Sequence, residues 1–376
     1  MPDYIRAAQI RLACPDLEAS LRFYTEKLGF SVELVMPADA PSLAVVSAHG
    51  LTLRLEAAPA GAAMELRLLC DMKTLPAGMA RELTAPEGTR VVLVEAEPPI
   101  ELPEGRQEFV LVRLGDQGAG AWGVGRAGME YRDLIPGRLG GRFIASQIRI
   151  REGGPVGDWV HYHRIRFQMI YCLKGWVRLV YEDQGEPFVL NEGDSVLQPP
   201  EIRHRVLESS PGLEVIEIGC PAVHETHADR AMTLPTAERR PDRRFGERLF
   251  AAQGKGGQRF ARHMAASAIW SPWRLDGFEA RDTGIAAATS GLASVRVVRP
   301  VAGRSVAESV SHQGEFQFLF VLKGALTLEG RELGRHHLSA GDCCVIPAGT
   351  AHSIAAEPGL EFLDVTLPAE LPLTRG

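Results

Sequence analysis

Three histidines with the spacing of metal ligands are the residues of this chain most suited to chemistry. His161 and His163 are two positions apart, so on an extended segment their rings point to the same face. His204 follows after a glycine turn and a further run of strand-forming residues. Neutral imidazoles bind zinc, copper, iron and nickel. A His-x-His pair alone is more often structural, but together with the third histidine it predicts a transition-metal site.

The residues around these histidines resemble the two motifs of the cupin superfamily. The first motif has a glycine, a His-x-His pair, an acid and a second glycine; the second has a glycine, a Pro-x-Gly unit and a histidine. The matching residues are Gly157, His161, His163, Gly175, Gly193, Pro199 and His204. Two positions depart from this pattern, because Gln168 stands where the family has glutamate and Glu201 replaces the glycine after Pro199.

The resemblance implies that the three histidines are metal ligands, with Gln168 as a fourth ligand or an orienting neighbour. If the neutral amide oxygen binds, the site keeps the ion's double positive charge; otherwise a position stays open beside a hydrogen-bond donor. Either arrangement favours an anionic, chelating small-molecule substrate. An amide does not titrate in the useful range, so Gln168 cannot be a general base and the catalytic residue stays unknown. Three neutral histidines with open positions suit Fe(2+), with manganese, nickel and zinc as alternatives.

An internal repeat divides the C-terminal two-thirds of the chain into two similar halves. Segment 128–133 recurs at 277–282, and 167–175 recurs at 316–324, both at an offset of 149 residues. Gly193-Asp194 recurs as Gly341-Asp342 at an offset of 148. Short β-rich runs between glycine and proline turns are typical of sandwiches and barrels. With the cupin resemblance, the repeat predicts two jelly-roll β-barrels, a bicupin, over residues 120–376.

The second half of the repeat has an incomplete ligand set. Val310 stands at the place of His161, and the remaining counterparts are His312, Gln317 and His352. A valine cannot bind metal, and two histidines with a glutamine make at best a weak second site. Glu308 or Glu315 would contribute only if the strand shifted. We therefore expect this barrel to be mainly structural.

The first 115 residues follow a different pattern. Asp16 is a natural N-cap for an apolar series at helical spacing that ends at Gly29. Strand-like runs lie at 10–12, 43–46 and 51–55. This βαβββ order and the Asp-Leu-Glu-x-Ser-x-x-Phe-Tyr-x-x-x-Leu-Gly-Phe signature resemble the glyoxalase/bleomycin-resistance (vicinal-oxygen-chelate) module. A weaker second copy is expected from Glu65 to Leu114.

Metal-binding members of that family carry a histidine or glutamine on the first strand and a glutamate on the last strand of each copy. Gln9 holds one such place, and the other three hold Arg54, Met64 and Val112. One ligand in four cannot hold a divalent ion. We therefore expect the first domain to be metal-free.

The predicted fold is mostly β, with an α+β N-terminal part. The expected divisions are a glyoxalase-like domain over 1–115, the first cupin barrel over 120–222, a connector over 223–270 and the second barrel over 271–376. The connector is rich in charge and glycine, which is typical of a solvated loop. His224, His227 and His263 lie in it and match no motif, so we expect them on the surface.

The composition excludes several classes of protein. The chain has 376 residues, 45% hydrophobic and 23% charged, which is ordinary for a globular protein. A net charge of -6 argues against a nucleic-acid partner. No apolar run reaches membrane-spanning length, and the start lacks the layout of a signal peptide. Six cysteines, of which Cys343 and Cys344 are adjacent and the rest scattered, form no CxxC pair and predict buried reduced thiols and a cytoplasmic location. The cupin resemblance implies a homodimer.

These observations favour a metal-dependent enzyme. Three-histidine cupins include non-haem iron dioxygenases that act on small diketones, hydroxyketones or aromatic compounds, and this oxidoreductase activity is our leading hypothesis. Two alternatives stay open, since one fold hosts many functions. One is a metal-stabilised small-ligand-binding protein without turnover, and the other is a metal-dependent isomerase.

Overall fold

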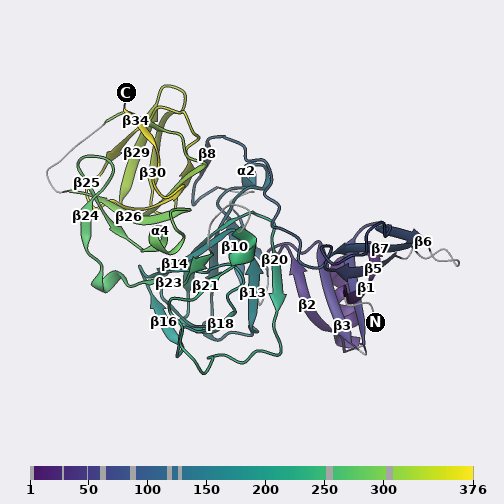
Figure 1. Ribbon diagram of the computed structural model, residues 1–376. Helices are drawn as coiled ribbons and strands as arrows, with labels where there is room; N and C mark the ends of the chain where they lie inside the picture. Colours follow the sequence, from purple (N-terminus) through teal and green to yellow (C-terminus); the bar gives the residue numbers. More distant parts are fainter. Residues whose placement is uncertain are drawn as a thin grey trace. The chain divides into compact units, whose positions relative to one another are not determined.

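The computed structural model describes residues 4–27, 29–48, 50–59, 65–84, 90–116, 121–125, 129–250, 257–301 and 308–375 (Figure 1). It divides into two compact units. The first comprises Met1–Glu101, Trp159–Arg164 and Val223–Met232, and the second comprises Leu102–Asp158, Ile165–Ala222 and Thr233–Gly376. Among the helices within these ranges, none has the length and apolar character needed to cross a membrane.

The start of the first unit has the predicted βαβββ order. Strand β1 (Ile5–Cys14) leads into helix α1 (Leu17–Arg22) and a π-helical turn (Phe23–Lys27), and β2 (Ser31–Met36), β3 (Leu43–Ala48) and β4 (Leu51–Ala57) follow. The side chain of Asp16 accepts a hydrogen bond from the backbone N–H of Ala19, as expected of an N-cap. Gly29 has φ +70°, a conformation that favours glycine at the end of a helix.

The expected second copy of this module is only partly present. Strands β5 (Glu65–Cys70), β6 (Glu82–Thr84) and β7 (Arg90–Glu95) extend the sheet, in the order β2-β3-β4-β1-β5-β7-β6. Met64 lies outside the described residues. The expectation for Val112 was wrong: strand β8 (Val110–Val112) pairs with β31 (Cys343–Val345) of the second barrel. Val112 is 4% exposed in an apolar core there, and this burial explains the pairing.

The first barrel illustrates how strand alternation separates two apolar cores. Its main strands in the second unit are β11 (Ile144–Ile150), β14 (Phe167–Lys174), β15 (Trp176–Tyr181), β17 (Ser195–Leu197), β18 (His204–Ser209) and β19 (Leu213–Cys220). On β14, Phe167 and Met169 enter one core, while Cys172 enters the other, inside the barrel. On β19, Val215 lies in the inner core and Ile216 in the outer one. Residues two apart on these strands therefore share a face.

The second barrel repeats this arrangement. Its strands β25 (Phe278–Asp282), β26 (Ser294–Pro300), β33 (Glu361–Leu367), β28 (Phe316–Lys323) and β31 form one sheet, and β30 (Gly334–Ser339), β29 (Ala325–Gly330) and β32 (Ser353–Ala356) form another. The outer core contains residues of both halves of the repeat, including the stacked rings of Phe143 and Phe316, whose centroids are 4.0 Å apart. The two barrels are therefore packed together through one shared core.

The repeated Gly-x-Glu-x-Arg-Asp motif has a structural role in this packing. Arg132 of the first copy is fully buried and donates to the backbone oxygen of Gly341 in the second barrel. Its counterpart Arg281 donates to the hydroxyl of Tyr171 in the first barrel. The arginine at the same motif position in each copy thus donates a hydrogen bond to the other copy.

The segment expected to be a connector, 223–270, contains several paired strands. Strand β20 (Glu225–Ala228) pairs with β13 (His161–Arg164), and β23 (Ala261–His263) pairs with β17. His263 is 8% exposed, so the expectation that it lies on the surface was wrong. Its backbone is held in a sheet, and burial lowers the pKa of its imidazole.

Candidate metal centre

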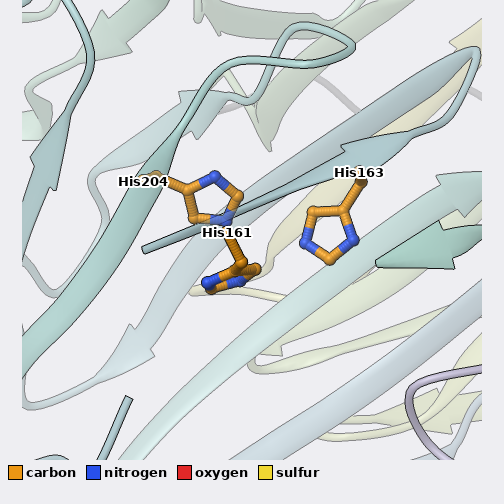
Figure 2. A group of neighbouring side chains, drawn as sticks. All are labelled: His161, His163 and His204. Atoms are coloured by element: carbon orange, nitrogen blue, oxygen red, sulfur yellow. The ribbon is translucent and has the colours of Figure 1, made fainter. Parts of the chain in front are cut away.

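The three predicted histidines come together. The exposed fractions of His161, His163 and His204 are 2%, 8% and 4%. One ring nitrogen of each lies within 4.8 Å of those of the other two. Figure 2 shows the three rings turned toward one another. The pair on β13 is brought onto one face by strand alternation, as the His-x-His spacing predicts.

Hydrogen bonds at the outer nitrogens orient these rings. Nδ1 of His161 lies 2.8 Å from the backbone oxygen of Trp159, and Nδ1 of His204 lies 3.0 Å from that of Ile202. A carbonyl oxygen only accepts, so both Nδ1 atoms carry the proton and both Nε2 atoms keep a lone pair. Nδ1 of His163 lies 2.9 Å from the hydroxyl of Thr226. Metal-binding histidines are typically held in this way through the nitrogen that does not bind the metal.

Gln168 supplies an unpaired oxygen in the same barrel. It is 2% exposed and lies on β14, and its Nε2 donates to Oε1 of Glu217 at 2.5 Å. Its own Oε1 is buried without a hydrogen-bond partner. A buried unpaired amide oxygen is costly unless something binds it. The group of three imidazoles, with an unpaired amide oxygen in the same barrel, is chemically suited to a divalent transition metal.

Glu217 is a functional candidate that the sequence analysis missed. It lies on β19, two positions from Val215 of the inner core, and its carboxylate contacts Gln168. The motif comparison considered only the residue at the glutamate position of β14, whereas this carboxylate comes from a different strand. Nothing in the cupin motifs points to it, since the pairing of β14 with β19 joins residues far apart in the chain.

Gln198 is a second polar residue without a signal in the motifs. It is 4% exposed, and its Nε2 lies 2.7 Å from Nε2 of His204. Because that imidazole nitrogen holds a lone pair, the amide donates to it. His204 can bind a metal only if the Gln198 side chain turns away. The corresponding position of the second barrel is Ile346.

Two histidines expected on the surface lie beside β13. The ring of His224 is 5.4 Å from that of His163 between centroids, in an edge-to-face arrangement. The ring of His227 stacks on Tyr162 at 4.9 Å, and its Nε2 lies 2.9 Å from a carboxylate oxygen of Glu225. Both are partly buried, so they lie at the surface with their rings packed against residues of β13. The cause is the pairing of β20 with β13, which short-range sequence patterns do not reveal.

The two departures from the cupin pattern differ in their structural effect. Glu201 has φ +66°, in the left-handed region where glycine is favoured. The backbone of the motif is thus kept although its glycine is replaced. Motif glycines Gly175 and Gly193 have φ +76° and +86°, and a side chain at Gly175 would meet Oγ of Ser210. Gln168, by contrast, replaces a carboxylate by a neutral amide.

The second barrel holds its polar residues in a different arrangement. Nε2 of His312 lies 3.0 Å from the backbone oxygen of Ile346, and its Nδ1 accepts from the N–H of Gly314. Both nitrogens are therefore already bonded. His352 uses Nδ1 toward the backbone oxygen of Thr350, and Val310 is 2% exposed beside it. Burial lowers the pKa of both imidazoles.

A guanidinium lies near these two histidines. Arg274 donates to both carboxylate oxygens of Asp364, at 2.5 and 2.6 Å, and Asp364 is 1% exposed. The charge of Arg274 also lowers the pKa of both His312 and His352. Gln317 keeps a buried unpaired Oε1, as Gln168 does. In the part of the chain that the structure describes, these residues do not form a group like that of the first barrel.

In the N-terminal domain, two residues at the places of the family's metal ligands, Arg54 and Gln9, lie beside charged side chains of the sheet. Arg54 of β4 forms an ion pair with Glu56, and Arg11 of β1 contacts the same carboxylate at 2.5 Å. Gln9 lies opposite Arg67 in the pairing of β1 with β5.

Comparison with known families agrees with this architecture. Residues 148–218 and 296–366 each match the cupin domain family. Residues 6–101 match the glyoxalase/bleomycin resistance protein/dioxygenase superfamily. The chain is therefore a bicupin with an N-terminal glyoxalase-like domain, as the motifs predict.

Several solved structures resemble the chain at low sequence identity. Oxalate decarboxylase of Lactobacillus farciminis is 13% identical, with a TM-score of 0.48 over 73% of this chain and 90% of that one. Salicylate 1,2-dioxygenase of Pseudoaminobacter salicylatoxidans is 15% identical, with a TM-score of 0.47 over 73% and 86%. Protein YlbA of E. coli is 12% identical, with a TM-score of 0.47 over 72% and 94%. No curated protein matches the sequence significantly.

Proposed function

We propose that the protein is a metal-dependent cupin enzyme whose centre lies in the first barrel, and that it is a non-haem iron dioxygenase. The observation that supports this most is the group of three buried histidines. In His161 and His204 the Nδ1 proton is bonded to a backbone oxygen, which directs the Nε2 lone pair of each ring into the group; at His204 the Gln198 amide has to turn away before a metal binds. Such preorganised imidazoles are what a transition metal requires.

His161, His163 and His204 would hold the ion, with Oε1 of Gln168 as a fourth donor. A bound divalent metal would supply Lewis-acid chemistry and, if it is iron, access to dioxygen. The protein's own contribution is a dry, ordered site. Tyr181 is 1% exposed, and its ring stacks on that of His204 with centroids 5.4 Å apart. All three histidines are buried, so little of their ring surface is open to solvent.

The substrate proposed is a small, anionic, chelating compound such as a diketone, a hydroxyketone or a hydroxylated aromatic acid. Three neutral imidazoles offset none of the double positive charge, and one neighbouring carboxylate would offset only half of it, so the centre favours an anion that offers two oxygens. Fe(2+) is the proposed metal, and manganese, nickel and zinc are the alternatives. The homodimeric state and cytoplasmic location implied above stay predictions.

A second candidate is a small-ligand-binding protein without turnover. The observation that favours it is the contact between Gln198 and His204, which engages a ligand nitrogen in a hydrogen bond within the protein. A metal-dependent isomerase is the third possibility, since it needs the same ligands and no oxygen.

Metal content distinguishes these candidates first. Protein purified anaerobically without chelators is expected to hold about one equivalent of iron, and the His161→Ala/His204→Ala variant none, because loss of two of three imidazoles leaves too few donors. Elemental analysis measures both. Oxygen uptake with a panel of diketones and hydroxyketones then tests the reaction.

The other outcomes point elsewhere. Stoichiometric zinc or nickel without oxygen uptake would favour an isomerase. The absence of metal from both proteins would contradict the enzyme proposal and leave the binding protein.

A further inference from the structure

The first barrel contains a carboxylate whose place differs from the one in the family motif. Gln168 on β14 and Glu217 on β19 face the barrel interior, because each lies at even spacing from a residue of the inner core, Cys172 and Val215. Their side chains meet through the bond from Nε2 of Gln168 to Oε1 of Glu217. An acid is therefore present beside the position where the family has glutamate, but on the neighbouring strand.

This bond determines which way the Gln168 amide points. A carboxylate only accepts hydrogen bonds, so the NH2 group of the amide must face Glu217 and the oxygen must face away. A reversed amide would place its oxygen against the carboxylate, with two acceptors in contact. The oxygen that faces away is the buried Oε1 without a hydrogen-bond partner. The orientation of the proposed fourth donor thus depends on Glu217.

The charge of Glu217 also reaches the neighbourhood of the histidines. Tyr181 stacks on His204, and the pKa of the Tyr181 hydroxyl is raised, first by burial and then by the charge of Glu217. A negative charge in a low-dielectric interior stabilises a nearby cation more strongly than it would in water. The carboxylate is thus placed to stabilise a cation bound among the histidines.

The second barrel shows the same position used differently. Asp364 corresponds to Glu217, because each lies opposite the second residue after the glutamine: Ile170 pairs with Glu217, and Leu319 pairs with Asp364. Asp364 is bonded on both oxygens by Arg274. Both barrels therefore keep an acid on this strand, and in the second its partner is a guanidinium of the protein itself.

We propose that Glu217 is a positioning residue of the metal centre, which holds Gln168 with its amide oxygen toward the metal and supplies the negative charge that Gln168 lacks. This inference rests on the proposed function of the first barrel as a metal site. It assigns to β19 the carboxylate that the family motif has on β14.

Two substitutions separate orientation from charge. Glu217→Gln keeps an acceptor oxygen for Gln168 and removes the charge, whereas Glu217→Leu removes both. Loss of a group that orients a metal ligand typically weakens metal binding about 10- to 100-fold. We expect about a tenfold rise in the metal dissociation constant for Glu217→Gln and a larger rise for Glu217→Leu, measured by competition with a chromophoric chelator using Fe(2+) and Co(2+).

A swapped pair gives a rescue. In Gln168→Glu/Glu217→Gln the amide and the carboxylate exchange strands, the hydrogen bond between them persists, and the charge is kept. We expect this double variant to recover the affinity that Glu217→Gln loses. The visible spectrum of the Co(2+)-loaded protein should differ from wild type in Glu217→Leu, because the donor oxygen is released, and a merely structural residue would leave it unchanged.

Glu214→Gln is the matched control. Glu214 lies on the same strand but on the opposite face, and it also accepts a hydrogen bond from a glutamine, Nε2 of Gln147 at 2.5 Å. We expect this variant to bind metal as wild type does. Unchanged affinity in both Glu217 variants, with metal bound by wild type, would overturn this inference alone. A wild-type protein that binds no metal would overturn it together with the proposed function.

Discussion

The histidines of the two barrels differ in what their ring nitrogens touch. In the first barrel, backbone oxygens hold the Nδ1 atoms of His161 and His204 and leave Nε2 with a lone pair. In the second, both nitrogens of His312 are bonded to the backbone. Residue type alone does not distinguish a ligand from a structural histidine. The kind of hydrogen-bond partner does: Nε2 of His204 contacts the Gln198 side chain, which can turn away, whereas both nitrogens of His312 are held by backbone groups, which cannot.

The buried histidines of the second barrel predict a pH dependence of stability. The folded-state pKa values of His312 and His352 lie below their ordinary value because burial disfavours the charged ring. Below about pH 6.5 the unfolded chain then binds more protons than the folded one. The free energy of unfolding should therefore fall as the pH drops from 7 through the unfolded pKa toward the lower folded values.

Urea denaturation of wild type and His352→Gln between pH 7.5 and 5 measures this effect. The variant should show a shallower pH dependence, and His337→Gln, at a half-exposed side chain, should match wild type. A slope in His352→Gln as steep as in wild type would contradict the assignment.

At the scale of the element, two equivalent strands each place one acid beside the glutamine-bearing strand of their barrel. Strands β19 and β33 carry Glu217 and Asp364 at corresponding positions, and both pair with the strand that carries the glutamine. The turn before β25 adds Arg274 to the second barrel. In the second barrel the positive charge beside the acid is therefore the guanidinium of Arg274.

Removal of Arg274 should destabilise the second barrel strongly. Arg274→Met leaves Asp364, 1% exposed, as an unpaired buried charge, and the loss of one partner of a buried ion pair typically costs about 3–5 kcal/mol. Chemical denaturation measures the change in the free energy of unfolding. Arg274→Met/Asp364→Leu removes both charges and should recover much of the loss. A loss below about 1 kcal/mol, as for an exposed pair, would show that water reaches Asp364.

At the scale of the molecule, the duplication is held together by one core. Phe143 and Phe316 stack across the two halves of the repeat. The motif arginine of each half donates a hydrogen bond to the other half. Such a shared core predicts that the two barrels unfold together.

Phe316→Ala tests this coupling. A buried aromatic truncation typically costs about 3–5 kcal/mol, and here the cost should lower the protection of both barrels. Hydrogen exchange measured by mass spectrometry should show β14 and β28 losing protection in parallel. Ile269→Ala, at a side chain that is 84% exposed, should change neither. Loss confined to β28 would mean that the barrels unfold independently.

Much of this architecture follows from local patterns in the sequence. The N-cap at Asp16, the duplicated cupin units and the face shared by His161 and His163 depend on spacing along a few residues or on a repeat, so no tertiary knowledge is needed to predict them. Several other features were missed. Glu217 and the partly buried His224 come from segments distant from the residues they contact, and Gln198, although only six residues from His204, belongs to no motif position.

The sequence by itself determined the type of the domains, the duplication and the three histidines. Only the tertiary structure decided which other groups reach that centre, that β8 belongs to the second barrel, and that the expected connector carries strands of the sheets. The physical reason is the nature of strand pairing. Alternation along one strand is a local property, whereas the partner of a strand depends on hydrogen bonds and burial between residues far apart in the chain.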